Sequence, residues 1–318
     1  MTGSNPRSKR RQRLGVIVPF RDSADGHGRN RRAHLGTFLP YMRRFLTAAG
    51  AEFRIVVVEQ TPGAPFNKGA LCNAGFLLSA EEYDYFAFHD LDQLPTDPRN
   101  SYACPGAVPV HLCSASSQYG YRPAYASMVG GALLMSREQY RRVNGFSNRY
   151  WGWGLEDDDM YVRIRRVFGR VARLPRTIGR YRALPHPRVA DLDRTAWYRA
   201  GRLYLERVIA GAADFRADGL GTLQFAVVEP RVAHGVRQFH RPPFGDVDQL
   251  LTDLELHEAA HELAHVVVVP ADAAVGPAYH KDPAHRGDPR CSRRALLEAK
   301  PICPLMGILT GLFSVGSK

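Results

Sequence analysis

Apolar and polar residues follow strand-like and helix-like patterns in alternation along most of the chain. Short apolar runs predict buried strands, and apolar residues at helical spacing predict amphipathic helices. The strands are expected over residues 14–20, 53–59, 83–89, 128–135 and 223–228, and the helices over residues 34–49, 67–80, 136–142, 156–168 and 195–209. Residues 97–126 and 184–193 are rich in turn-forming residues and are expected to form loops. This order predicts an α/β fold with a Rossmann-like, mainly parallel central sheet, whose ligands bind beyond the carboxyl ends of the strands.

The length and composition predict one large domain with appendages. The chain has 318 residues, of which 45% are hydrophobic, so it can bury a substantial core. We expect a basic N-terminal tail over residues 1–13, a folded domain over residues 14–270 and a loosely ordered C-terminal tail over residues 271–318.

The formal charge of +12 arises partly from clusters of arginine and lysine at residues 7–13 and 29–32. Such clusters are most often solvated tails, and no recognition-helix or RNA-binding signature supports nucleic acid as a partner. A basic chain also suits an anionic ligand such as a nucleotide sugar.

Five irregularly spaced cysteines without a CxxC pair predict free thiols rather than a disulfide scaffold or a cysteine zinc site. The basic N-terminal residues are not followed by the apolar segment of a signal peptide, and no run of 18 apolar residues predicts a membrane span. The sequence as written predicts a soluble, cytoplasmic protein.

The segment from Trp151 to Asp159 carries the strongest chemical signal. Four consecutive carboxylates follow two tryptophans and two glycines. Aromatic faces bind sugar rings and carboxylates bind hydroxyl groups, while crowding of like charges raises the pKa of at least one carboxylate, as a catalytic base requires. An acidic first turn is also what the helix dipole favours, so we expect these carboxylates to open the helix over residues 156–168 and to face a substrate.

A second signal is Asp90-Leu91-Asp92, which follows the predicted strand over residues 83–89. A carboxylate at the end of a strand is a suitable oxygen ligand for Mn²⁺ or Mg²⁺, and such a metal would stabilise charge on a leaving diphosphate. His186 is a candidate second metal ligand, although an isolated histidine in a loop more often binds no metal.

Seven blocks, in order over residues 14–230, closely resemble the β-1,4-galactosyltransferases of glycosyltransferase family 7. The blocks are Val18-Pro19-Phe20-Arg21; Phe66-Asn67-Lys68-Gly69-Ala70-Leu71 with Asn73 and Gly75-Phe76; Tyr83-Asp84-Tyr85 with Asp90-Leu91-Asp92; Gly130-Gly131; Asn144-Gly145-Phe146-Ser147-Asn148; Trp151 to Asp159; and Asp218-Gly219-Leu220. Each block is a weak signal by itself, but seven in the family's order make coincidence a poor explanation.

The resemblance implies a GT-A glycosyltransferase fold over residues 14–270 and inverting, metal-dependent transfer of galactose from UDP-galactose. The acceptor would be the 4-hydroxyl of a sugar of the xylose or N-acetylglucosamine type, carried on a glycan or glycoconjugate. By position, Asp157 would be the base, Glu156 and Asp158 would hold the acceptor, and Trp153 would lie between donor and acceptor. Asp92 and His186 would hold Mn²⁺, and the UDP contacts would be Pro19, Phe20, Arg21, Phe66, Lys68 and Asp90.

Three departures from the family's pattern leave the exact sugars open. Ala183 stands where members acting on N-acetylglucosamine have a methionine ligand, and Pro187 and Arg188 follow His186 where xylose-directed members have a His-x-His pair. Met128 stands where a tyrosine usually crowds the donor sugar, which makes UDP-N-acetylgalactosamine an alternative donor.

Other positions bear on the branch and on the compartment. His89 and Ser147-Asn148-Arg149 look more like the xylosylprotein β-1,4-galactosyltransferase branch. Cys104 matches a disulfide cysteine of luminal members, but its expected partner falls near Tyr85. This favours a reducing compartment, whereas a truncated family member would be expected in the Golgi.

Two functions of other classes remain as alternatives. Residues 257–265 contain two overlapping HExxH patterns, which on a helix could bind zinc in a metallopeptidase. The incomplete metal set would also suit a catalytically inactive sugar-binding module, although such a module would not need Asp157.

Overall fold

The computed structural model describes residues 11–22, 31–61, 64–185, 195–232 and 263–270. The chain divides into two compact units, Met1–Ala274 and Val275–Lys318, and every described residue belongs to the first unit. The predicted C-terminal tail over residues 271–318 lies outside the described residues.

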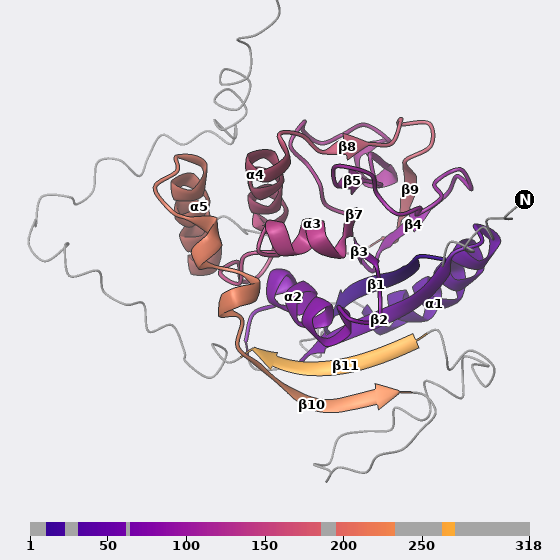
Figure 1. The fold of residues 1–318 in the computed structure, drawn as a ribbon, viewed down its shortest axis with the longest axis horizontal. Helices are drawn as coiled ribbons and strands as arrows, with labels where there is room; N and C mark the ends of the chain where they lie inside the picture. Colours follow the sequence, from indigo (N-terminus) through magenta and orange to yellow (C-terminus); the bar gives the residue numbers. More distant parts are fainter. Residues whose placement is uncertain (1–10, 23–30, 62–63, 186–194, 233–262, 271–318) are drawn as a thin grey trace, which may run out of the picture. The chain divides into compact units, whose positions relative to one another are not determined.

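A mixed sheet forms the centre of the first unit (Figure 1). β1 (Arg13–Phe20) lies between β2 (Glu52–Gln60) and β3 (Tyr85–His89) and runs parallel to both, and β11 (Leu263–Pro270) runs parallel to β2. β7 (Ala132–Ser136) pairs antiparallel with β3 and with β5 (Val110–His111). β10 (Phe225–Val232) pairs antiparallel with β11, and β8 (Ala172–Arg173) pairs parallel with β5. In spatial order the described strands are β10 (Phe225–Val232), β11 (Leu263–Pro270), β2 (Glu52–Gln60), β1 (Arg13–Phe20), β3 (Tyr85–His89), β7 (Ala132–Ser136), β5 (Val110–His111) and β8 (Ala172–Arg173). The predicted mainly parallel sheet is confirmed, with antiparallel pairings among its outer strands.

Helices cover both faces of this sheet and make strand β1 fully buried. Val16 and Val18 belong to the core on the side of α1 (Arg31–Ala48), whereas Ile17 belongs to the core on the side of α2 (Lys68–Ser79) and α4 (Glu156–Phe168). Gly75 allows α2 to lie close to the sheet, because a Cβ there would come within 2.7 Å of Val58. The other described helices are α3 (Arg137–Arg142), α5 (Ala196–Ile209) and the short 3₁₀ turns η1 (Ser117–Tyr119), η3 (Phe215–Ala217) and η4 (Leu220–Thr222).

A smaller sheet contains β4 (Gln93–Pro95), β9 (Arg180–Ala183) and β6 (Ala115–Ser116). β4 follows the end of β3 within four residues, so this sheet stands next to the Asp90-Leu91-Asp92 segment. The amide of Leu184 donates to the carbonyl of Asp92 at 2.7 Å, which brings the chain beyond β9 beside that segment.

Several predicted boundaries were wrong for identifiable reasons. The strand predicted from Met128 begins at Ala132, because the backbone of Gly131 bonds to Asp90 and has a φ of +88°. The helix predicted from His34 begins at Arg31, and the strand predicted over residues 223–228 runs from Phe225 to Val232. The predicted loop over residues 97–126 contains the short strands β5 and β6, which pairing partners stabilise despite a turn-rich sequence.

A zinc site at residues 261–265 would need a helix there, and the structure contradicts this because the last residues of that segment lie in a strand. His265 lies in strand β11, where a run of four valines from Val266 favours extended backbone. His257, Glu258, His261 and Glu262 lie outside the described residues.

The described cysteines Cys72, Cys104 and Cys113 are free thiols. Burial raises the pKa of Tyr85 to about 12, and Cys104 adds to that shift, so Cys104 lies near Tyr85, where the resemblance to luminal members places its partner. The described helices all fall short of the length and apolar character needed to cross a lipid bilayer.

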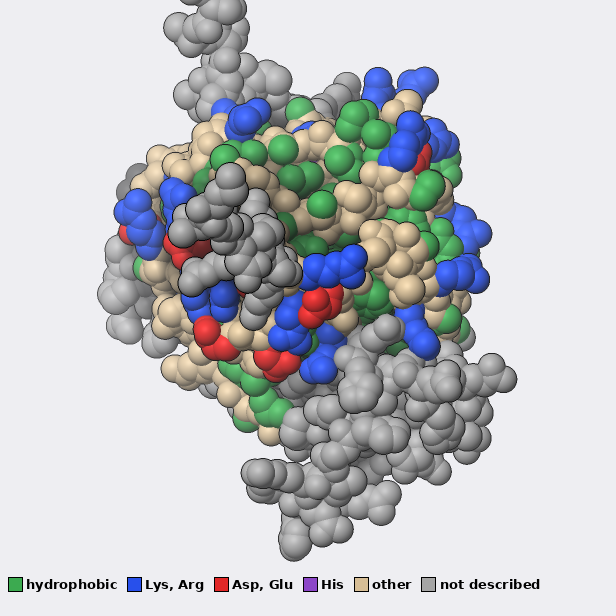
Figure 2. Space-filling view, turned by 45° about the vertical axis from the view of Figure 1, so that its right-hand side comes forward, with side chains coloured by type: hydrophobic (Ala, Val, Ile, Leu, Met, Phe, Trp, Pro, Cys, Tyr) green, Lys and Arg blue, Asp and Glu red, His purple; other side chains and the backbone are tan. Residues whose placement is uncertain are grey.

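Figure 2 shows lysine and arginine side chains spread over one face of the molecule, with fewer acidic side chains between them. This distribution is in keeping with the formal charge of +12.

Candidate active site

The acidic stretch reaches its position through three residues with left-handed backbone. Gly152, Gly154 and Leu155 have φ values of +88°, +89° and +77°, and the amide of Gly152 donates to the carbonyl of Phe66 at 2.7 Å. Leu155 is not a glycine, so its conformation is strained, and strain of this kind is concentrated at functional segments. α4 begins immediately afterwards at Glu156, as the sequence predicts, and its first turn therefore carries the carboxylates.

Lys68 is the centre of a buried charge cluster. Its Nζ lies 2.8 Å from Asp90 Oδ1, 2.9 Å from Asp157 Oδ2 and 3.3 Å from Glu156 Oε1, and its side chain is only 14% exposed. Asn67 caps α2 by accepting from the amide of Ala70, which fixes Lys68 at the first position of that helix. The first turns of α2 and α4 therefore meet at one ammonium group.

The carboxylates of this cluster have displaced pKa values. Burial raises the pKa of Asp157 to about 7, with Lys68 opposing the shift and Glu156 and Asp90 adding to it. Burial also raises the pKa of Asp158 to about 6, against the effect of a hydrogen bond from Tyr125. A carboxylate that changes protonation near neutral pH is suited to accept a proton from a substrate hydroxyl.

Asp90, which follows strand β3, has a pKa displaced in the opposite direction from those of Asp157 and Asp158. Burial opposes the charge on Asp90, but Lys68 outweighs that effect and the pKa of Asp90 is lowered. Its Oδ2 accepts from the amide of Gly131 at 3.1 Å. At the neighbouring Gly130 a Cβ would lie 2.6 Å from Asp157 Oδ2, so a side chain there would displace that carboxylate. Asp90, Gly130 and Asp157 are thus in close proximity around Lys68.

Aromatic side chains lie on both sides of the acidic turn. Trp153 is 52% exposed, an unusual degree for tryptophan, and the rings of Trp151 and Trp197 lie 6.1 Å apart. Tyr125 bonds to Asp158 from the loop before Gly130. The site therefore offers exposed aromatic surface next to carboxylates, the combination that recognises sugars.

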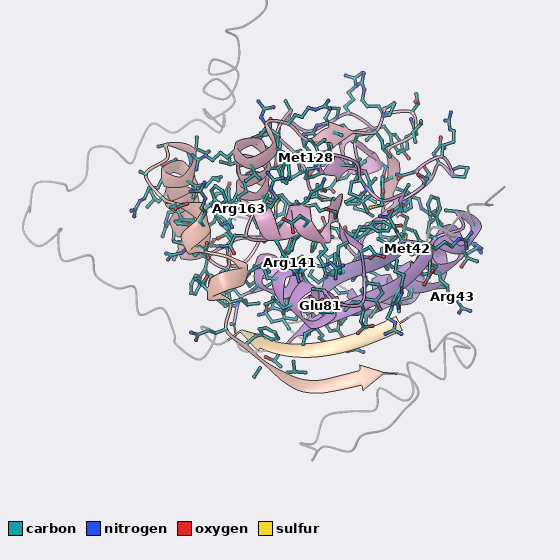
Figure 3. All side chains as sticks on the ribbon, in the orientation of Figure 1. Met42, Arg43, Glu81, Met128, Arg141 and Arg163 are labelled. Atoms are coloured by element: carbon teal, nitrogen blue, oxygen red, sulfur yellow. The ribbon has the colours of Figure 1, made fainter. Side chains whose placement is uncertain are left out.

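Of the predicted donor-binding residues, Pro19, Phe20 and Arg21 lie at the end of β1, and Phe66 lies in the segment that follows β2. Arg21 donates to the carbonyl of Ala64, and its guanidinium lies 5.9 Å from the ring of Phe66. Pro19 pairs with β2 in the sheet. The side chain of Phe20 is 1% exposed and packs in the core, so a ligand could reach only its backbone. Met128 is half-buried in the loop before Gly130 (Figure 3).

The predicted metal site is described on one side only. Asp92 is mostly buried and pairs with Arg31 at 2.9 Å. His186 lies outside the described residues. The carbonyl of the preceding Pro185 accepts a hydrogen bond from His34 Nε2 at 3.2 Å. No group of three or more metal-binding side chains occurs among the residues that the structure describes. The donor at hand, a carboxylate at a strand end, fits a hard divalent cation.

Arg163, one turn after Asp159 on α4, connects this helix to other parts of the domain by hydrogen bonds. Its side chain is completely buried, its Nε donates to Asp159 one turn earlier, and its Nη1 donates to the carbonyls of Asp218 at 2.7 Å and Gly145 at 3.2 Å. Tyr150 also donates to Asp159, at 2.8 Å. The fourth carboxylate of the acidic stretch therefore serves the core and not the open site.

The comparisons with known proteins agree with this geometry. Residues 3–105 match the family model described as the N-terminal region of glycosyl transferase group 7, and residues 110–187 match the model described as the N-terminal domain of galactosyltransferase. Together the two models cover more than half of the chain. The chain belongs to the β-1,4-galactosyltransferase family.

Relatives within this family include β-1,4-galactosyltransferase 2 of Cricetulus griseus, which is 36% identical over 221 residues. That match covers 69% of the chain and 56% of the relative, so the chain spans little more than half the length of this relative. The catalytic domain of Drosophila β-1,4-galactosyltransferase 7, solved with xylobiose, is 25% identical with a TM-score of 0.60, and the match covers 81% of the chain and 94% of that structure. A mutant of the same Drosophila enzyme, solved with manganese, UDP-Gal and xylobiose, is 24% identical with a TM-score of 0.58 over the same shares. These neighbours confirm the predicted GT-A fold.

Four residues of the site were missed by sequence reasoning: Arg31, Gly130 as a neighbour of the base, Tyr125 and Arg163. Arg31 stands in a basic cluster that reads as a solvated surface, and Tyr125 stands in a loop without periodicity. Arg163 offered a signal, because Asp159 and Arg163 are spaced four apart on a predicted helix, where opposite charges meet.

Proposed function

We propose that the protein is an inverting, metal-dependent β-1,4-galactosyltransferase that moves galactose from UDP-galactose to the 4-hydroxyl of an acceptor sugar. The observation that carries the proposal is the contact of Lys68 on α2 with Asp157 on α4, a buried carboxylate with a pKa of about 7. Four residues before Asp157, the side chain of Trp153 is exposed. Membership of the family supports the reaction class, and the xylobiose in the Drosophila structure supports a xylose-type or related acceptor.

In this proposal Asp157 accepts the proton of the acceptor hydroxyl. The hydroxyl oxygen then forms a bond to the anomeric carbon of galactose, and the bond from that carbon to UDP breaks, with its electron pair leaving on the diphosphate. Because one displacement inverts the anomeric centre, no protein nucleophile is required. Glu156 and Asp158 would bind the acceptor hydroxyls, and Trp153 would stack on the sugar rings.

The donor side would use Pro19, Phe20, Arg21, Phe66, Lys68, Asp90 and Met128. Arg21 and Phe66 already contact each other, and Lys68 connects this side to the base. Phe20 would act through its backbone, since its side chain is buried. A positively charged donor side is suited to the diphosphate of a nucleotide sugar.

Asp92 and His186 would hold Mn²⁺, which when bound supplies positive charge to the leaving diphosphate. The Drosophila relative solved with manganese and UDP-Gal supports the choice of metal. Asp92 fits this role because it ends a strand and offers a hard oxygen donor, and Arg31 would have to share or release that oxygen.

The test is release of UDP from UDP-galactose and from UDP-N-acetylgalactosamine, with Mn²⁺, in the presence of xyloside or N-acetylglucosaminide acceptors. We expect acceptor-dependent release from the wild type, and loss of at least a hundredfold in Asp157→Asn. Removal of metal by chelation should abolish release and added Mn²⁺ should restore it. Equal release by wild type and Asp157→Asn would refute the assigned base, and no release with any pair would refute the transferase.

A further inference from the structure

We infer that a pocket at the far end of α4 from the carboxylates binds a tetrahedral oxyanion, a phosphate or sulfate group. The pocket has a volume of about 680 Å³, within the range of small-molecule sites. Its basic residues come from three separate elements: Arg142 from α3, Arg166 from α4 and Arg216 from η3. The catalytic carboxylates open α4 and Arg166 lies near its end, so the two sites stand roughly 15 Å apart along the helix.

The three guanidinium groups are held in place by neutral partners. Arg142 lies 4.5 Å from the ring of Phe168, and Arg216 lies 5.7 Å from the ring of Phe215. Arg166 donates to the carbonyls of Val208 and Ile209, at the end of α5. Side chains held in this way lose less conformational freedom when they bind a ligand.

None of these three arginines pairs with a carboxylate of a described residue, unlike the neighbouring Arg141, which pairs with Glu81 at 2.7 Å (Figure 3). The one carboxylate in the pocket is Asp214, whose Oδ1 accepts from the amide of Arg216 at 3.0 Å and so caps η3. Three positive charges and one negative charge therefore line the pocket.

The chemistry of the lining selects the class of ligand. Guanidinium groups form paired hydrogen bonds with the oxygens of phosphate and sulfate, and the partly exposed Val167 adds apolar surface for the group that carries the anion. A sugar phosphate or a sulfated sugar would match both parts of the lining better than a bare anion.

The experiment measures binding of inorganic pyrophosphate, glucose 6-phosphate and glucose by calorimetry, without divalent metal and at low salt. We expect both anions to bind, glucose not to bind, and affinity to fall as salt is raised. The variant Arg142→Gln with Arg216→Gln should weaken binding by about tenfold or more, since it removes two charge-assisted contacts. Tighter binding of glucose 6-phosphate than of pyrophosphate would identify a sugar-borne group as the ligand.

Two control variants make the result specific. Arg44→Gln removes an exposed arginine of α1 that also lies over an aromatic ring, that of Tyr41, and should leave binding unchanged. Arg21→Gln alters the donor side of the active site, where pyrophosphate can also bind, and should leave the binding of glucose 6-phosphate unchanged. The inference is overturned if the double variant binds as the wild type does, or if Arg21→Gln alone abolishes that binding, because the anion would then occupy the active site.

Discussion

Replacing Lys68 by methionine tests how the charge cluster sets the state of the base. The change keeps an unbranched side chain that is one heavy atom shorter, and it removes the charge that lies 2.9 Å from Asp157 and 2.8 Å from Asp90. An opposite charge at such distances lowers the pKa of a carboxyl by about 1–3 units, so its removal should raise the pKa of Asp157 by that amount above its present value. That value is about 7.

The expected result is a shift of the pH profile and not a uniform loss. Asp157 can accept a proton only when it is ionised, so activity is lost as the pH falls through its pKa. In Lys68→Met the acid limb of kcat/KM should move up by about 1–3 units, which at pH 7 lowers activity by roughly fivefold to five-hundredfold. Activity should recover towards the wild-type level as the pH is raised beyond the new pKa.

The assay is acceptor-dependent UDP release measured from pH 5.5 to 9.5, with Lys68→Arg as the matched control that keeps the charge. Lys68→Arg should retain the wild-type acid limb. A loss in Lys68→Met that is equal at every pH, and that appears as a higher KM for UDP-galactose, would refute the reasoning. Lys68 would then act on the donor and not on the base.

Three further predictions concern the surroundings of the base. Gly130→Ala should lower kcat by about a hundredfold with little effect on melting temperature, because its Cβ would displace the carboxylate of Asp157. The control Gly36→Ala, whose Cβ meets no atom within 4 Å, should leave kcat unchanged. A fully active Gly130→Ala enzyme would contradict the close approach of Gly130 to Asp157. In a denaturant titration, Arg163→Met should lower the free energy of unfolding by about 3–5 kcal/mol, because it leaves buried carboxylates unpaired. The control Arg202→Met removes an exposed ion pair and should lower it by less than about 1 kcal/mol. Asp157→Asn should raise the melting temperature at pH 8 by at least about 2–4 °C but not at pH 4. The folded-state pKa of Asp157, about 7, exceeds the ordinary 3.8, so ionisation of Asp157 opposes folding as the pH rises between these values. A variant that is less stable than the wild type at pH 8 would contradict the raised pKa.

The central part of the fold was predictable because it depends on local patterns. The strand over residues 14–20 and the helix over residues 156–168 match their apolar runs and spacing, since both elements bury one continuous surface. Boundaries failed where tertiary contacts compete with the local pattern. At Gly131 the amide and carbonyl bond to Asp90 instead of extending β7, and a window of local sequence contains no trace of that partner.

The site was predictable in its chemistry but not in its connections. The acidic stretch indicated a base among its carboxylates, and the resemblance to the family assigned that role to Asp157 and placed Lys68 near a donor. The contact between these two residues joins positions 89 apart in the sequence, and it exists only because α2 and α4 pack on the same face of the sheet. The pKa of Asp157 depends on that contact and on burial, so the properties of the base required the fold.

The four consecutive carboxylates illustrate how a helix separates roles that look alike in sequence. Each residue is turned by about 100° from the one before, so neighbours on α4 face different surroundings. Glu156 and Asp157 meet Lys68, Asp158 meets Tyr125, and Asp159 turns into the core to meet Arg163. Because Arg163 also binds the carbonyl of Asp218, the fourth carboxylate fixes the helix whose first turn carries the base. The acidic stretch therefore combines the reacting group with part of the support that positions it.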